Sequence, residues 1–251
     1  MKIVFVSSGS KGNATLIAHE EGLIQIDMGV PKKEVAQGLK ILDRKLEDIQ
    51  GVFITHEHSD HIGGLVTYQG KIPLYASEGT LPKEDISCVL NPGVGVDIAP
   101  FMVFPFSASH DANNPVNYVI YAGKEKLGYV TDTGLIYEEN LPLLKNCDYY
   151  LFESNHDYKM LLKSSRPLAL KRRIHSEHGH LCNIDAAKYL CSLIGPNTKQ
   201  IFLGHISDEC NTTELALAAL RKEMVEQGID DSHIKITAIP QKTLQIGGEL
   251  L

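Results

Sequence analysis

The stretch Gly51-Val52-Phe53-Ile54-Thr55-His56-Glu57-His58-Ser59-Asp60-His61 decides most of what this chain can be. Its apolar start, residues 51–54, predicts a short buried strand, and the polar cluster that follows is then delivered to an edge of a sheet. His56 and His58 are two residues apart, so on an extended chain their side chains project to the same side.

Asp60 and His61 close this stretch on a predicted turn, where their side chains reach a second position. Imidazole and carboxylate are ligands that suit zinc, manganese or iron. Ligands divided between two positions indicate two ions a few ångströms apart. Scattered surface histidines are the alternative, but so many ligand-type side chains in six positions need a reason to tolerate one another's charge. The stretch therefore predicts a metal site.

Length and composition favour one large α/β domain spanning residues 1–251, with no linker or repeat visible. No apolar stretch is long enough for a membrane span, so a cytoplasmic protein without a membrane partner is expected. The five cysteines are an odd number without a Cys-x-x-Cys pair, which indicates free thiols in a reducing cytosol. The metal ligands are therefore expected to be histidines and carboxylates.

The charge pattern leaves two interpretations open for one segment. The formal net charge of −7 argues weakly against a protein that coats nucleic acid. Residues 159–173 nevertheless carry six lysines and arginines. A solvated helix face and a local patch for a nucleic-acid end both fit this segment.

Hydrophobic periodicity predicts strands in the first half and a mixture of strands and helices in the second. The expected strands are residues 3–6, 16–17, 23–26, 51–54, 72–76, 102–107, 117–121, 127–130, 200–203 and 234–239. Helices are expected to start at Pro31, Asn183 and Asn211 and to end near Leu46, Gly195 and Gly228. This order predicts sheets covered on the outside by helices.

His110, Asp132 and His205 each follow an expected strand. One such residue alone is more often structural than a ligand. Because all three follow strands, as the cluster after residue 54 does, each one makes the assignment of the others as metal ligands more credible. The pattern His-x-His-x-Asp-His, a later histidine, an aspartate in Thr-Asp-Thr-Gly and a final histidine resembles the metallo-β-lactamase superfamily. The resemblance covers nearly the whole chain and implies a four-layer αββα sandwich with a two-metal site.

The resemblance also implies how two divalent ions, zinc or manganese, would be held. Three ligands are assigned to the first ion: His56, His58 and His110. Three are assigned to the second: Asp60, His61 and His205. Asp132 would bridge both, and Asp27 would support the ligand loop from behind, unless it is only a turn residue at a strand end.

Two ions that share a water lower its pKa, so the resemblance implies hydrolysis by an activated hydroxide. The fold alone leaves lactams, thioesters, lactones and phosphodiesters open. Asp60 beside Asp132, with no cysteine ligand, resembles the phosphodiesterase and nuclease branches and makes manganese suitable beside zinc. A β-CASP insertion is not expected, because only 72 residues lie between Asp132 and His205.

Further motifs resemble the YycJ group, also called VicX or WalJ, and imply a bacterial exonuclease that acts on DNA ends. They are residues 8–13, 153–157, 179–183 and 203–211. Cys182 and Cys210 depart from the group's usual residues, but neither is an expected ligand.

Four residues of these motifs are expected to contact substrate. Ser10 and Asn13 lie in a glycine-rich turn that suits a phosphate, although a plain hairpin loop is the alternative. His180 precedes a helix and Asn183 stands at its start, and the N-terminus of a helix favours an anion. His180 and Asp60 are expected to be catalytic, with His180 binding the scissile phosphate or protonating the leaving oxygen.

Two other functions stay open. A hydrolase of the same fold could cleave a small or cyclic phosphodiester or a thioester, and the negative net charge favours it. A regulatory metal-binding protein without turnover is the third, and the complete ligand set argues against it.

Overall fold

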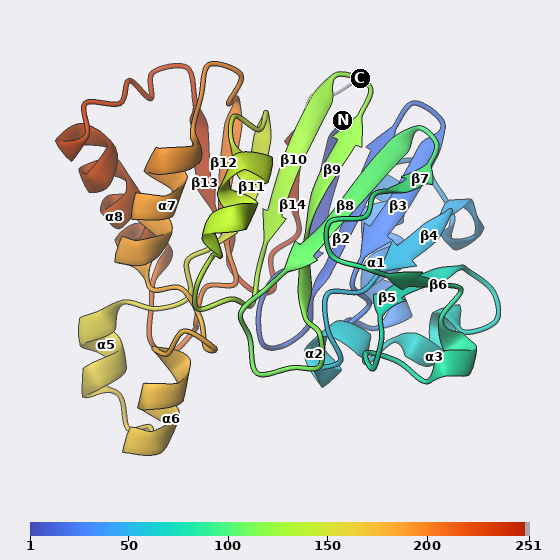
Figure 1. Cartoon of the computed structure of the whole chain (residues 1–251), viewed down its shortest axis with the longest axis horizontal. Coiled ribbons are helices and arrows are strands. Elements are labelled where there is room, and N and C mark those ends of the chain that lie inside the picture. Colours follow the sequence, from blue (N-terminus) through green and yellow to red (C-terminus); the bar gives the residue numbers. More distant parts are fainter. Residues whose placement is uncertain (249–251) are drawn as a thin grey trace. The chain divides into compact units, whose positions relative to one another are not determined.

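Two seven-stranded β-sheets with flanking helices organise the computed structural model, which describes residues 1–248 (Figure 1). The strand orders are β14-β1-β2-β3-β4-β5-β6 and β13-β12-β11-β10-β9-β8-β7. The chain divides into two compact units. Unit 1 holds residues 1–107, 112–125 and the segment from residue 242, and unit 2 holds residues 108–111 and 126–241.

The first sheet lies wholly in unit 1. Its strands are β1 (Lys2–Ser7), β2 (Ala14–His19), β3 (Gly22–Ile26), β4 (Gly51–Phe53), β5 (Leu74–Ser77), β6 (Cys88–Leu90) and β14 (Gln245–Gly248). Strands β14 to β3 pair antiparallel and β3 to β6 pair parallel. Strands β3 and β4 are buried at every residue, as expected for strands covered on both faces.

One face of this sheet packs on an antiparallel strip of unit 1. The strip consists of β7 (Val96–Ile98), β8 (Phe101–Ser107) and β9 (Val116–Ala122). The ring of Phe53 on β4 meets that of Tyr118 on β9 edge to face at 6.0 Å. The Tyr118 hydroxyl donates to the carbonyl of Ile54 at 2.5 Å. The end of β4, and with it the histidine cluster, is thereby held by the second layer.

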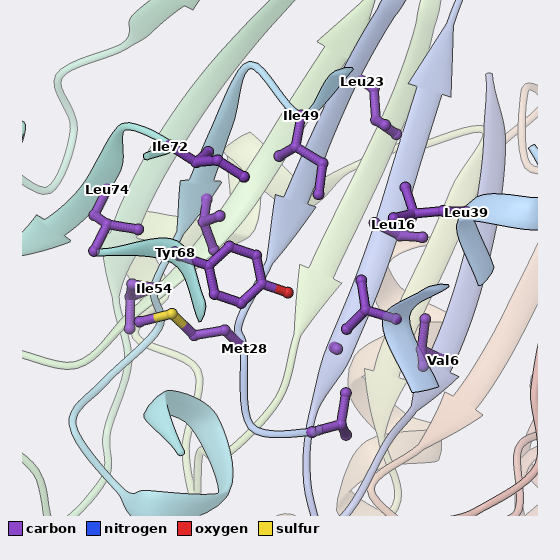
Figure 2. Close-up of a cluster of buried hydrophobic side chains, with 14 of the residues drawn as sticks. Val6, Leu16, Leu23, Met28, Leu39, Ile49, Ile54, Tyr68, Ile72 and Leu74 are labelled. Carbon is purple, nitrogen blue, oxygen red and sulfur yellow. The ribbon is translucent and has the colours of Figure 1, made fainter. Parts of the chain in front are cut away.

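Helices cover the opposite face of the first sheet. They are α1 (Lys32–Ile41), α2 (Ser59–Ile62), α3 (Leu65–Tyr68) and the 3₁₀ turns η1 (Leu46–Asp48) and η2 (Lys83–Asp85). Figure 2 shows Leu16 of β2, Leu39 of α1 and Tyr68 of α3 in the resulting apolar cluster. The one polar atom of Tyr68 exchanges hydrogen bonds with the buried amide of Gln25, at 3.0 and 3.1 Å.

Unit 2 is built on parallel strands. They are β10 (Glu125–Val130), β11 (Tyr149–Glu153), β12 (Gln200–Gly204) and β13 (Lys235–Ala238). The helical elements are η3 (Glu138–Asn140), α4 (Leu141–Leu144), α5 (Tyr158–Lys163), α6 (Leu168–Ile174), α7 (Asn183–Leu193) and α8 (Thr213–Glu226). Helices α7 and α8 pack on each other and beside β11 and β13 (Figure 1). Because β10, β11 and β12 are neighbours and parallel, their carboxyl ends meet at one edge.

All ten expected strands are confirmed, with shifts of a few residues at their ends. Helix α7 starts at Asn183 as expected, with Cys182 as its N-cap, whereas α1 and α8 start at Lys32 and Thr213, one and two residues later than expected. The first helix also ends at Ile41, five residues early, before a separate 3₁₀ turn. Strands β6, β7, β11 and β14 were not expected from the sequence. None of the helices within residues 1–248 has the length and hydropathy that crossing a membrane requires.

Candidate metal centre

Three loops of unit 1 are joined by backbone hydrogen bonds beneath the histidine cluster. Asn13 N–H donates to the carbonyl of Asp60 at 2.7 Å, and Met28 N–H donates to that of His61 at 2.8 Å. A Cβ atom on Gly29 would lie 1.5 Å from the Asp60 carbonyl oxygen, so only glycine fits there. The ligand loop is therefore held by main chain before any side chain is considered.

The histidines of the ligand loop have defined partners on their ring nitrogens. His61 Nδ1 lies 2.8 Å from Asp27 Oδ2, and its Nε2 lies 2.9 Å from the side-chain amide nitrogen of Asn13. An amide N–H can only donate, so His61 Nε2 carries the lone pair and Nδ1 the proton. His56 Nδ1 lies 3.0 Å from Thr55 Oγ1, and its Nε2 lies 3.0 Å from His58 Nδ1. His56 and His58 therefore turn ring nitrogens toward each other, whereas those of His61 face Asp27 and Asn13.

Asp27 stands behind this loop, where the resemblance placed it. Its carboxylate is fully buried and accepts hydrogen bonds from Thr55 N–H at 2.8 Å and from Thr55 Oγ1 at 3.0 Å. Burial raises the pKa of Asp27 above its ordinary value, against the opposing effect of His61. Asp27 thus fixes the proton on His61 but has only one histidine to stabilise its charge.

Asp132 lies among three imidazoles of unit 2. Its Oδ1 is 3.4 Å from His205 Nε2, 3.7 Å from His180 Nδ1 and 3.9 Å from His110 Nε2. The residues come from the ends of β8, β10 and β12 and from the loop before α7. Four of the five residues expected from the sequence in this unit are therefore brought together. The exception is Asn183.

Glu153 is a residue of this cluster that the sequence interpretation did not assign. Its Oε1 lies 2.8 Å from both His180 Nδ1 and His205 Nδ1, and its Oε2 accepts from Thr133 N–H at 2.9 Å. Burial alone would raise the pKa of Glu153, but the charges and hydrogen bonds of His180 and His205 hold it well below its ordinary value. A signal was present, because the apolar run 149–152 ends in this carboxylate just as other strands end in Asp27 or Asp132.

The loop that carries His180 is pressed against the loop that carries Asp132. A Cβ atom on Gly134 would lie 2.1 Å from the Ser176 carbonyl oxygen. A Cβ atom on Gly179 would lie 2.2 Å from the Arg173 carbonyl oxygen. The Gly179 carbonyl in turn accepts from His110 Nδ1 at 3.0 Å. These glycines permit the close approach that brings the imidazoles together.

Backbone strain marks the same positions. Asp27, Asp132 and His205 have φ values of 57°, 48° and 53°, which few residues other than glycine adopt. Each directly or nearly follows a strand that ends at the cluster of its unit. Such conformations cost about 1–3 kcal/mol and persist mainly at functional sites. The surrounding structure therefore holds all three residues in an uncommon conformation, which Glu20, Asp43, Asn114 and Asn146 also adopt.

Both clusters suit a divalent ion in their donor chemistry. His61, His110 and His205 each turn Nδ1 to a carboxylate or carbonyl oxygen, an arrangement typical of metal-binding histidines. In unit 2, ligand atoms of four residues lie within 4.8 Å of one another: Asp132, Glu153, His180 and His205. Imidazole with carboxylate, and no thiolate, fits zinc or manganese.

The other residues expected to contact substrate are Ser10, Asn13 and Asn183. Ser10 is exposed, whereas Asn13 is buried and exchanges hydrogen bonds with the backbone of Gly9. Asn183 is also buried, where it accepts from Ser154 Oγ at 2.7 Å and pairs with Asn211. The buried amides hold loops in place in this structure, and substrate contact by these residues stays a prediction.

Residues 27–206 match the sequence model of a β-lactamase superfamily domain. The chain is 34% identical over 235 residues to the exodeoxyribonuclease YycJ of Bacillus anthracis, covering 89% of each chain. It is also 34% identical over 238 residues to the exodeoxyribonuclease WalJ of Streptococcus pneumoniae, covering 90% of this chain and 88% of that one. Among solved structures, the metallo-β-lactamase fold protein YhfI of Bacillus subtilis superposes with a TM-score of 0.69 at 14% identity, over 98% and 99% of the two chains.

Proposed function

Because the chain belongs to the metallo-β-lactamase superfamily and to its YycJ and WalJ group, we propose that it is a dinuclear metal-dependent phosphodiesterase that digests DNA from an end. The observation that carries the proposal is the cluster around Asp132, where His180 and His205 share the carboxylate of Glu153. Relatives named exodeoxyribonucleases at 34% identity support the substrate class. A bacterial cytosol is the proposed setting.

The proposed ligands are divided between two ions. One ion is assigned to His56, His58 and His110, the other to Asp60, His61 and His205, with Asp132 shared. Two divalent ions would activate water and neutralise charge on a phosphoryl group.

His180 is proposed to act on the leaving oxygen or the scissile phosphate. Its Nδ1 lies 2.8 Å from Oε1 of the buried Glu153, which orients the imidazole ring. The side chain is 17% exposed, so the ring is accessible at the margin of the cluster. If His180→Ala turned over a small phosphodiester as fast as the parent chain, this role would be wrong.

A digestion time course tests the proposal. The protein is loaded with manganese or zinc and given end-labelled linear DNA with a 5′-phosphate or a 5′-hydroxyl. Asp132→Asn is the matched inactive variant, because asparagine tolerates the positive φ of this position as alanine does not. Metal-dependent release of nucleotides from one end, lost in the variant, is the expected result. Turnover of bis-p-nitrophenyl phosphate or a thioester without digestion of DNA would instead indicate a small-molecule hydrolase.

A further inference from the structure

Helices α5 and α6 form a short hairpin with two different faces. On the inner face Leu161 and Ile174 are buried against Cys210. On the outer face Tyr158, Leu162 and Leu168 are 44%, 51% and 60% exposed. Folding alone does not require three large apolar side chains to be this exposed on one short hairpin.

The same hairpin is strongly cationic. Residues 158–174 contain six lysines and arginines and no acidic residue, in a chain of net charge −7. Three of the cations have partners: Arg166 pairs with Glu209, Arg173 pairs with Asp111, and Lys171 donates to the backbone of Leu162 and Ser164.

The other three cations are Lys159, Lys163 and Arg172. All are exposed, and none forms an ion pair with an acidic side chain within residues 1–248. Their charge is therefore available to an outside anion.

Helical spacing places cations beside apolar groups. Tyr158 and Leu162 are four residues apart, as are Lys159 and Lys163, so α5 carries an apolar stripe next to a basic one. Tyr158 also has support from behind. Its ring centroid lies 4.7 Å from that of His175, and His175 Nδ1 lies 3.1 Å from Nε2 of the buried His156. The tyrosine ring is thus held in place while 44% of the residue stays exposed.

The hairpin is joined directly to the loop of His180. The backbone N–H of His180 donates to the carbonyl of Ile174, the last residue of α6, at 2.9 Å. A Cβ atom on Gly179 would lie 2.3 Å from that same oxygen, so the loop doubles back tightly on the helix end. Anything bound to the hairpin is therefore bound beside the chain segment that positions His180.

We propose that the outer face of this hairpin binds the unpaired end of a nucleic-acid strand. The face consists of Tyr158, Lys159, Leu162, Lys163, Leu168 and Arg172. A base stacks on Tyr158, and the three cations contact phosphates, a combination that binds single strands with little sequence preference. A lipid surface would call for a longer apolar helix face than these six- and seven-residue helices offer. The inference deepens the proposed function and rests on it for the identity of the substrate as DNA.

Binding is measured first, by fluorescence anisotropy in the Asp132→Asn background with manganese, so that no turnover interferes. Tyr158→Ala is expected to weaken binding of a single-stranded oligonucleotide by about 10- to 100-fold, and Tyr158→Phe to restore it. Removing the three cations together (K159A/K163A/R172A) is expected to reduce the magnitude of the slope of log K against log[salt] by about 2. The matched control is K32A/K33A/K40A, which removes three exposed lysines from α1 and should leave binding unchanged.

Turnover is measured second, in the otherwise unaltered chain. Tyr158→Ala should lower kcat/KM on single-stranded DNA by the same factor and leave that on bis-p-nitrophenyl phosphate unchanged. Unaltered binding in Tyr158→Ala, or an equal loss on the small diester, overturns the inference, as does binding to phosphatidylglycerol vesicles but not to DNA. A parent chain that binds DNA through Tyr158 yet digests neither substrate overturns the proposed function instead.

Discussion

The two clusters of candidate ligands are built in different ways. In unit 1 they come from six consecutive residues, 56–61, on one strand end and one short helix. In unit 2 they come from five places between His110 and His205, and neighbouring parallel strands bring most of them together. The first cluster is a property of a segment, whereas the second is a property of a sheet edge.

The buried carboxylates behind the clusters differ in the same way. Asp27 serves one histidine, and burial raises its pKa. Glu153 serves two histidines and two backbone N–H groups, and its pKa is lowered despite complete burial. A buried carboxylate remains charged only where enough donors replace the lost water. Glu153 is accordingly expected to matter more than Asp27.

Glu153→Gln should therefore have the largest effect. Either orientation of the new amide places its N–H groups against histidine or backbone donors, and the histidines lose their anionic partner. We expect metal affinity and turnover each to fall about 100-fold. Competition with a chromophoric chelator measures the affinity, and the small diester measures turnover. A change below threefold would mean that the unit 2 cluster does not depend on this residue.

His156 tests whether burial in unit 2 produces a pH response. Burial lowers its pKa from 6.5 to about 4, so between these values the unfolded chain binds a proton that the folded chain does not. The contribution of His156 to the free energy of unfolding is complete above about pH 6.5. It is lost as the pH falls toward 4, by up to about 3 kcal/mol. Urea unfolding of metal-free protein should show this slope in the parent chain and not in His156→Gln. The exposed His233, changed to Gln, is the control and should keep the slope.

Asp27→Asn should have a smaller effect, of about 10-fold on metal affinity. Asparagine tolerates the positive φ and can still accept from Thr55, but its N–H₂ group turned toward His61 would favour the wrong tautomer. The same chelator competition measures it beside Glu153→Gln. If Asp27→Asn lowered metal affinity more than Glu153→Gln does, the comparison would be wrong, because the carboxylate that contacts one histidine would then matter more than the one that contacts two.

Ser10→Ala should have the smallest effect. Ser10 is exposed, so we expect kcat/KM to change by about twofold or less. Asn13→Ala in the same turn should cost more, because it removes hydrogen bonds to Gly9 and the contact with His61. Steady-state kinetics on DNA compares the two. A larger loss for Ser10→Ala would indicate direct contact with substrate.

The difference between the clusters also explains what could be predicted. The local motif and the strand ends at Asp27, Asp132 and His205 carry clear apolar runs before them, so their positions were recognisable. The start of α8 was displaced because tertiary contacts use the expected capping residue. Asn211 bonds to Asn183 and to the Ser154 carbonyl, and Thr212 caps α8 instead.

By itself the sequence determined the chemistry: histidines and carboxylates at strand ends, a metal-ligand motif and a cationic segment. Only the tertiary structure decided which of these groups act on one another. Glu153 became the shared partner of His180 and His205 because β11 and β12 lie in register, pairing Glu153 with Gly204. The tertiary structure likewise decided which cations of the α5–α6 hairpin have partners. Ion pairs and backbone contacts engage three of the six, and the spacing of residues in the sequence does not reveal which three. Residue types are local, whereas distances between strand ends depend on how the whole sheet is ordered.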